Sequence, residues 1–274
     1  MPSQRCRSTP EYMHSERLKI FRIRKCLIHG GLLIFLLWVN GCGPTTAKKQ
    51  KRVKAFQDLG NAMATEGNLR GALAELLKGL KLDPDNATLN HQAAVVLRNL
   101  GQYELSLKYF RKSLELDPKF SEARNNMGTV YLIMEKWDPA IACFQETLGD
   151  LLYKTPQYAY NNMGYAYYMK GDYDKAIECY KQAIRSFRAY TVAHVNLGRA
   201  YAAKGDLEAA EAAYKNAILY SPKDGAAHLG LARLLLKRGN QGAAKEELNL
   251  TIWADPMSRE AQEARELLKR IKKE

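Results

Sequence analysis

The sequence predicts an all-α protein, a right-handed α-solenoid of about six helix-turn-helix repeats with a C-terminal capping helix. Three observations support this: a pattern that recurs about every 34 residues, small residues at fixed places in it, and helix-breaking residues where each helix should stop. The stretch 191–224 shows all three. Leu197 and Tyr201 have the spacing of one helical face, Gly205 breaks the helix, and Pro222 ends the unit because proline cannot continue a helix.

A second helical face follows in the same stretch, marked by Ala210, Tyr214 and Ala217 at positions i, i+4 and i+7. This order of small and large residues, with a 34-residue period, resembles the tetratricopeptide repeat. The resemblance implies a stack of helix pairs, because one such unit alone cannot bury its apolar face.

Alignment on the position of Gly198 divides most of the chain into repeats. The six predicted repeats are 53–86, 87–120, 121–156, 157–190, 191–224 and 225–258. Residues 259–274 have apolar side chains on one face and charges elsewhere, which predicts a capping helix over the last repeat.

The third repeat departs from the pattern because it has 36 residues and ends at Pro156 in an unusual sequence, TLGDLLYKTPQY. We expect either a longer second helix or a two-residue bulge before Pro156. Within each repeat, small residues such as Gly128 and Gly164 should let the two helices approach closely.

The N-terminal segment has the features of an export signal. Basic residues between Arg17 and Lys25 precede the apolar run Gly30 to Val39. Ten helical residues cover about 15 Å, whereas a bilayer core is about 30 Å thick, so the run fits a signal peptide better than a membrane span. This pattern favours residues 1–41 as a signal peptide and Met13 as the true start.

The sequence Val39-Asn40-Gly41-Cys42 ends this segment and resembles the lipobox of bacterial lipoproteins. The resemblance implies lipidation of Cys42 after cleavage just before it; an uncleaved anchor helix is the alternative. Residues 42–52 are then expected to be the lipidated cysteine and a polar tether. Residues 1–41 hold seven Lys/Arg and two Asp/Glu, so their removal lowers the net charge from +13 to +8.

Catalytic and metal-binding motifs are not evident, so we predict neither an enzyme nor a bound cofactor or metal. His194 and His228 share one repeat position and are expected to pack. Cys143 and Cys179 also share one position. Neighbouring helices lie 8–10 Å apart, too far for most disulfides, so both should be small, partly buried apolar residues.

A protein-binding groove is the favoured functional site. The repeat resemblance implies that the first helix of each unit lines a concave surface. In the middle repeats this surface would carry asparagines, whose amides can pair with an extended peptide backbone, beside tyrosine and arginine. The predicted groove residues are Asn125, Asn126, Thr129, Asn161, Asn162, Tyr165, Tyr168, Asn196, Arg199 and Arg233. The irregular segment 149–156 is an alternative site.

A lipobox followed by six such repeats is similar to the type IV pilus biogenesis and stability lipoproteins, the pilotin family. Residues 144–148 and 160–164 resemble that family's longer third repeat and the start of its fourth. The resemblance implies an outer-membrane, periplasm-facing lipoprotein that helps the pilus secretin reach the membrane and oligomerise. Gly43, rather than aspartate, after the cysteine favours the outer membrane.

The expected partner is therefore a protein segment, extended or helical, held in the groove, with the membrane reached through the lipid anchor. Nucleic acid and small-molecule substrates are not expected. The alternative function is an envelope scaffold that docks peptidoglycan hydrolases or other secretion machinery.

Overall fold

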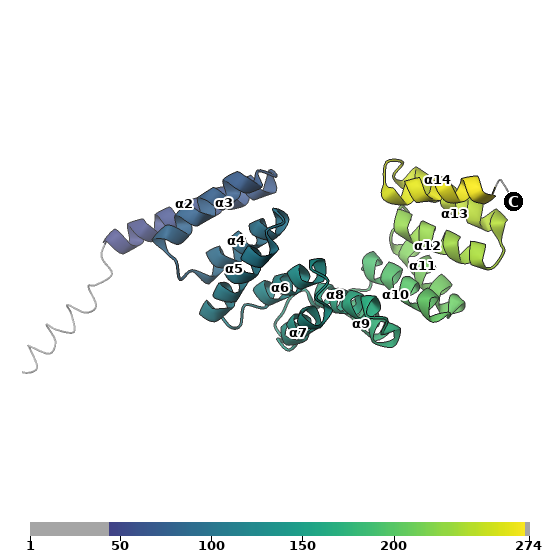
Figure 1. The fold of residues 1–274 in the computed structure, drawn as a ribbon, viewed down its shortest axis with the longest axis horizontal. Helices are drawn as coiled ribbons and strands as arrows, with labels where there is room; N and C mark the ends of the chain where they lie inside the picture. Colours follow the sequence, from purple (N-terminus) through teal and green to yellow (C-terminus); the bar gives the residue numbers. More distant parts are fainter. Residues whose placement is uncertain (1–43, 272–274) are drawn as a thin grey trace, which may run out of the picture.

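The computed structural model describes residues 44–271, which form thirteen α-helices and no β-strand (Figure 1). The first helices of successive pairs are α2 (Pro44–Thr65), α4 (Ala87–Asn99), α6 (Ser121–Ile133), α8 (Pro156–Met169), α10 (Thr191–Lys204) and α12 (Gly225–Lys237). The second helices are α3 (Leu69–Leu82), α5 (Tyr103–Leu116), α7 (Trp137–Leu148), α9 (Tyr173–Ser186), α11 (Leu207–Tyr220) and α13 (Gln241–Ala254). Helix α14 (Arg259–Ile271) follows the last pair. The predicted α-solenoid is confirmed.

The helix pairs stack into an open arc with α6 to α9 at its middle (Figure 1). Each first helix contacts the first helix of the next pair, from α2 through α12 and on to α14. Consecutive second helices, such as α5 and α7, have no Cα atoms within 8 Å of each other in the described part of the chain. The first helices therefore line the inner face of the arc.

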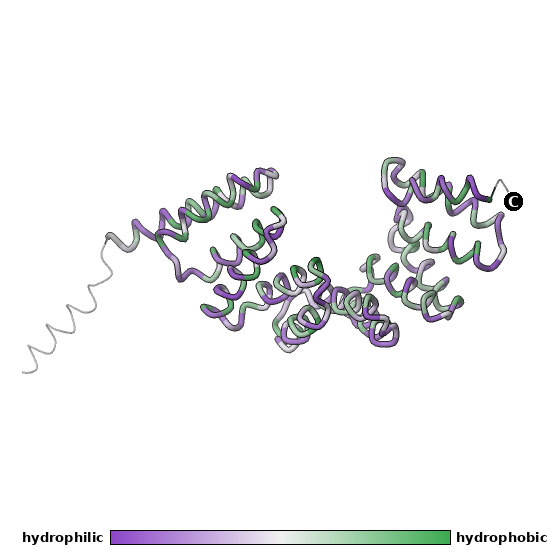
Figure 2. Tube along the Cα trace, in the orientation of Figure 1, coloured by the Kyte–Doolittle hydropathy of each residue, from purple (hydrophilic) through white to green (hydrophobic). Residues whose placement is uncertain are grey.

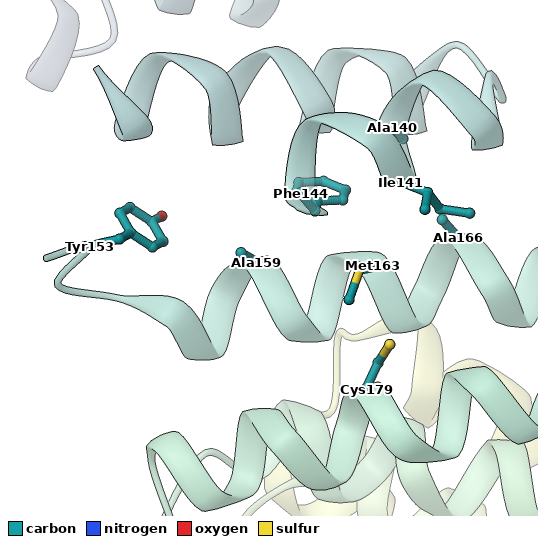
Figure 3. Close-up of a cluster of buried hydrophobic side chains, with 8 residues drawn as sticks. All are labelled: Ala140, Ile141, Phe144, Tyr153, Ala159, Met163, Ala166 and Cys179. Atoms are coloured by element: carbon teal, nitrogen blue, oxygen red, sulfur yellow. The ribbon is translucent and has the colours of Figure 1, made fainter. Parts of the chain in front are cut away.

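The apolar core is divided into clusters along the arc rather than gathered in one place. Figure 2 shows apolar and polar residues alternating along every helix, with no single apolar block. Figure 3 shows one cluster, in which Phe144 of α7 lies over Ala159 and Met163 of α8, with Tyr153 on the segment that leads into α8. Each cluster joins neighbouring repeats, as expected for units that cannot bury their apolar faces alone.

Close helix packing within a repeat depends on the glycines that the sequence pattern indicates. A Cβ atom added to Gly164 would lie 2.7 Å from Cε1 of Tyr180, a residue that is 1% exposed. Gly128 has the same relation to Phe144. The first helix can pass directly over the aromatic ring only because these positions lack a side chain.

The tight turn between the two helices of a repeat contains a left-handed glycine in five repeats, among them Gly101 (φ 74°) and Gly171 (φ 80°). The third repeat differs, because Glu135 occupies the equivalent place with φ 57°. A side chain in this region of backbone space is strained by contact of its Cβ with the following carbonyl.

The junction after the third repeat is the irregular part of the arc, as the sequence indicates. Helix α7 has 12 residues where α5 and α9 each have 14, so the expectation of a longer second helix is wrong. Residues 149–155 connect α7 to α8, whereas residues 117–120 suffice between α5 and α6. The extra residues form a longer loop.

Two further expectations concern the N-terminus and the cysteines. The tether predicted at 42–52 is helical from Pro44 onward, because Ala, Lys and Gln are good helix formers and α2 continues without a break into the first repeat. Cys143 and Cys179 are unpaired, as expected, and are more deeply buried than expected, being 7% and 6% exposed. Cys42 and the segment before it lie outside the described residues. No helix within residues 44–271 combines the length and apolarity that a membrane crossing requires.

Candidate functional site

The predicted groove residues all lie on the first helices α6, α8, α10 and α12, which line the inner face of the arc. The structure gathers seven of the ten into two hollows. The middle hollow, of about 360 Å³, is lined by Glu122, Asn125, Asn126, Thr129, Tyr153, Thr155, Tyr158 and Asn162. The C-terminal hollow, of about 280 Å³, is lined by Tyr168, Arg199, Ala202, Ala203, Tyr214, Gly230, Arg233, Leu234 and Lys237.

Polar side chains on consecutive first helices pair with each other across the repeat boundaries. Nδ2 of Asn196 donates to Oδ1 of Asn161 at 2.9 Å, from one repeat to the one before. A similar pair joins the third repeat to the second, where Nδ2 of Asn126 lies 3.0 Å from Nε2 of His91. Because an asparagine Nδ2 can only donate, Nε2 of His91 is the acceptor and the imidazole is neutral. These pairs use one amide hydrogen each of Asn126 and Asn196.

The equivalent pair is missing between the third and fourth repeats. Asn125 occupies the position of His91 and Asn161, and Asn162 occupies the position of Asn126 and Asn196. Yet Oδ1 of Asn125 is buried without a hydrogen-bond partner. This unpaired position lies at the junction where the connection between repeats is the longer loop 149–155.

That loop also builds one wall of the middle hollow. Asp150 holds it against α6, because its Oδ2 accepts from Oγ of Ser121 at 2.6 Å and its Oδ1 accepts from the backbone N–H of Leu152 at 2.9 Å. These bonds lower the pKa of Asp150. Tyr153, further along, is 8% exposed, and burial raises the pKa of its hydroxyl, with a contribution from the Glu122 carboxylate. The groove and the loop, considered above as alternative sites, thus contribute to the same hollow.

The α6 side of the middle hollow is held by hydrogen bonds from within α6 and from α4. Oγ1 of Thr129 donates to the carbonyl oxygen of Asn126 at 2.6 Å. Nη1 of Arg98, on α4, donates to the same threonine oxygen at 3.2 Å. Thr129 is therefore fixed in place by both contacts.

The C-terminal hollow is basic. Arg233 pairs with Glu263 of α14, whereas Arg199 makes only a long hydrogen bond, 3.5 Å, to Oδ1 of Asn196. Its floor is the ring of Tyr214, which reaches the inner face because Gly230 has no side chain: a Cβ there would lie 2.4 Å from Cε1 of that ring. This packing explains why glycine replaces the asparagine found at this position in the three preceding repeats.

Three predicted residues, Asn161, Tyr165 and Asn196, line neither hollow. Asn161 is 6% exposed and serves as an acceptor inside the structure. Tyr165 is 39% exposed and packs edge-on against Trp137, with ring centroids 6.3 Å apart.

Sequence reasoning missed several lining residues. Glu122 and Tyr158 could have been found from spacing, because they lie three residues before Asn125 and four before Asn162 on the same helical faces. Nothing in the sequence predicts that Tyr153 turns back toward α6.

The buried histidines hold helix ends rather than a reactive site. Nε2 of His194 lies 2.9 Å from the carbonyl oxygen of Arg188, and Nε2 of His228 lies 3.0 Å from that of Pro222, six residues earlier in each case. Nδ1 of His228 also lies 2.6 Å from Oε2 of Glu247, which raises the pKa of the imidazole. The described residues contain no cluster of three or more side chains that could hold a metal ion.

Three segments match family models described as tetratricopeptide repeat: residues 85–150, 158–186 and 202–268, together more than half of the chain. The chain is a tetratricopeptide-repeat protein. This fold is a protein-interaction scaffold, and no catalytic family is among the matches.

Solved structures similar to this tetratricopeptide-repeat protein include PilF of Pseudomonas aeruginosa, at 21% identity and a TM-score of 0.68, over 79% of this chain and 97% of that one. PilW, described as a widely conserved type IV pilus biogenesis factor, is 23% identical with a TM-score of 0.70, over 77% of this chain and 96% of that one. YrrB, described as a TPR protein with an unusual peptide-binding site, is 20% identical with a TM-score of 0.53, over 70% of this chain and 97% of YrrB. At these identities the likeness establishes the fold.

Curated relatives match over shorter regions. The photosystem I assembly protein Ycf3 of Cyanophora paradoxa is 32% identical over 88 residues, 31% of this chain and 51% of Ycf3. The Hsp70-Hsp90 organizing protein 3 of Arabidopsis thaliana is 26% identical over 105 residues, 38% of this chain and 18% of that protein. The chain thus spans about half of the first relative and less than a fifth of the second.

Proposed function

We propose that this protein is an outer-membrane lipoprotein that faces the periplasm and assists type IV pilus biogenesis by helping a secretin reach the membrane and oligomerise. The observation that carries the proposal is that its repeats cover nearly the whole length of PilF and PilW, and that a lipobox-like sequence, Val39 to Cys42, precedes them. Shared fold alone does not fix a partner, and the lipobox supplies the independent reason to look in the bacterial envelope.

The inner face of α6 to α12 is the proposed partner site. Its two hollows lie on consecutive first helices, so an extended segment running along the arc would pass both. Asn162 and Arg199 are the best-placed contacts, because Asn162 lines the middle hollow and Arg199 is exposed without a carboxylate partner in the described structure. Net hydrogen-bond contributions of about 0.5–1.5 kcal/mol each would weaken binding roughly tenfold when both contacts are lost.

A deletion strain tests the pilus function directly. We expect loss of detergent-resistant secretin multimers and of surface pili, restored by the wild-type gene. Asn162→Ala with Arg199→Glu should restore both poorly. Gln182→Ala, on α9 away from both hollows, is the matched control and should restore them fully. Normal secretin multimers in the deletion strain would refute the secretin role, and envelope proteins captured with the protein would then test the docking of hydrolases or other secretion machinery.

Lipidation is tested separately by labelling cells with a clickable fatty acid. The wild-type protein should be labelled and should sediment with outer membranes. Cys42→Ala should lose both properties, since stable membrane attachment needs more than one acyl chain and a bacterial lipoprotein carries three. Equal labelling of both proteins would disprove lipidation at this residue.

A further inference from the structure

The middle hollow contains an acceptor that the rest of the fold leaves unpaired. At the same position in neighbouring repeats, Nε2 of His91 and Oδ1 of Asn161 each accept an amide hydrogen from the following repeat. Oδ1 of Asn125 accepts none, although Asn125 is only 8% exposed. A buried polar atom without a partner is costly, so native structures rarely retain one without a reason. Gln92 and His194 also have such an atom, but neither lines this hollow.

The same hollow carries a carboxylate and no basic side chain. Glu122 lies one turn before Asn125 on α6 and is exposed, and in the described part of the chain it forms no ion pair. Arg98 of α4 donates to Thr129, which lies two turns after Glu122 on α6, and Lys154 lies in the loop between the lining residues Tyr153 and Thr155. The C-terminal hollow, by contrast, contains Arg199, Arg233 and Lys237. The charged side chain that lines the middle hollow is therefore acidic, whereas those that line the C-terminal hollow are basic.

Two tyrosines complete the lining. Tyr153 is buried in the loop wall, whereas Tyr158 is 46% exposed and is held edge-on against Tyr190, with ring centroids 5.4 Å apart. Tyrosine rings attract cations over their faces and accept the aliphatic stem of a long side chain. A cationic N–H donor on a long aliphatic stem would match all three features: the unpaired acceptor, the carboxylate without an ion pair and the aromatic rings.

We propose that the middle hollow binds a lysine or arginine side chain of an extended partner segment, with one N–H donated to Oδ1 of Asn125 and the positive charge facing Glu122. This inference rests on the proposed role of the inner face as the partner site. The adjacent C-terminal hollow would then meet an acidic or neutral part of the same segment.

Fluorescent nonapeptide pools test the proposal on the full-length protein in detergent micelles. Each pool has random neutral residues around one fixed central residue, which is lysine, arginine, norleucine or glutamate. Binding is measured by fluorescence anisotropy at 50 mM and 300 mM salt. We expect the lysine and arginine pools to bind at least fivefold more tightly than the norleucine pool, and the difference to shrink at high salt. The protein's own net charge, +13 for the full sequence and +8 after removal of residues 1–41, opposes this preference, so non-specific attraction does not account for it.

Two variants connect the preference to the site. Glu122→Gln keeps the shape of an exposed side chain and should abolish the preference for basic pools. Glu246→Gln, an equal charge change at an exposed α13 position without an ion pair in the described structure, should leave it intact. Asn125→Ala should weaken binding of the lysine and arginine pools at least threefold.

The outcomes separate this inference from the proposed function. If all four pools bind equally, or if Glu122→Gln retains the preference, the inner face still binds peptides but the basic-side-chain site is refuted. If no pool binds, peptide binding by the inner face is itself refuted, and the basic site with it.

Discussion

Asn196 donates a side-chain hydrogen to Asn161, which lies one repeat earlier and 2.9 Å away. The two residues occupy adjacent positions of the repeat, so the bond crosses from one first helix to the previous one. Because the same geometry recurs between Asn126 and His91, the polar residues of the inner face first stabilise the stack. Their remaining hydrogen-bonding groups are available to a partner.

Replacing Asn161 and Asn125 by leucine should have opposite effects on stability. Asn161→Leu removes the acceptor of Asn196 and should lower the free energy of unfolding by about 1 kcal/mol. Asn125→Leu removes an acceptor that has no partner, so stability should stay the same or increase. Urea unfolding followed by circular dichroism measures the free energy of unfolding of both variants. Each variant is the control for the other, because both make the same substitution at a buried inner-face position. Equal losses would show that Asn125 does have a partner in solution.

Gly164→Leu should destabilise the middle of the array. A side chain there collides with Tyr180 and with Cβ of Cys179, which lies 3.1 Å from the added Cβ position. Overpacking of this kind costs about 1–3 kcal/mol. The control is Gly242→Leu, because the nearest atom to a Cβ at Gly242 is 3.9 Å away. An unchanged thermal midpoint for Gly164→Leu would contradict the close packing of α8 on α9.

Glu135→Gly should stabilise the third repeat. A left-handed conformation costs a residue with a side chain about 1–2 kcal/mol, and part of this gain is offset by the greater freedom of glycine in the unfolded chain. We expect a net gain of about 0.5–1 kcal/mol. Glu135→Ala removes the charge but keeps the strain, so it should produce no comparable gain. Similar midpoints for both variants would argue against strain at this turn.

His91 should make stability depend on pH in the acid range. Burial, with a smaller effect of the Arg98 charge, lowers the pKa of His91 to about 4. The unfolded chain binds this proton near pH 6.5 and the folded chain only near pH 4, so the contribution is complete above about pH 6.5 and is lost as pH falls towards 4. His91→Asn places the residue of the next two repeats at this position. It should keep an acceptor for Asn126 and reduce the slope of unfolding free energy against pH in this range.

His228 should act in the opposite direction. The hydrogen bond to Glu247 raises its pKa, so the protonated imidazole stabilises the sixth repeat below about pH 6.5, and this contribution is lost as pH rises through the raised pKa. His228→Gln should therefore lose more stability at pH 6 than at pH 9. Titration of the His228 ring protons by NMR gives an independent reading, and a midpoint at or below 6.5 would contradict the prediction.

The repeat pattern predicted the helices well because its positions report on packing that is local in sequence. Gly164 and Tyr180 belong to one repeat, so their contact follows from spacing alone. The helical extension of α2 before Val53 does not follow from the sequence pattern, because residues 46–52 are exposed and have no apolar periodicity. Likewise, the two extra residues of the third repeat indicate an irregularity before Pro156. They do not determine whether the second helix or the following loop is longer.

The candidate site was predicted only in part for a similar reason. Position in the repeat places Asn125, Asn126 and Asn162 on the inner face, but it does not determine which amides pair with each other. Whether Asn125 finds a donor depends on how the first helices of the third and fourth repeats are placed, and the loop 149–155 that connects these repeats has no counterpart in the repeat pattern. The contribution of Tyr153 to the hollow has the same origin, since a loop has no periodicity from which its side-chain directions could be inferred.

First helices of neighbouring repeats approach within 8 Å between Cα atoms, whereas consecutive second helices in the described array do not, so we expect the arc to resist bending unequally in its two directions. A tighter curve would press helices together that already touch on the inner face. A flatter curve would instead bring the second helices, which are further apart, closer together. We therefore expect the groove to widen more easily than it narrows, so that a partner segment with bulky side chains would be accommodated by small rotations shared among the repeat junctions.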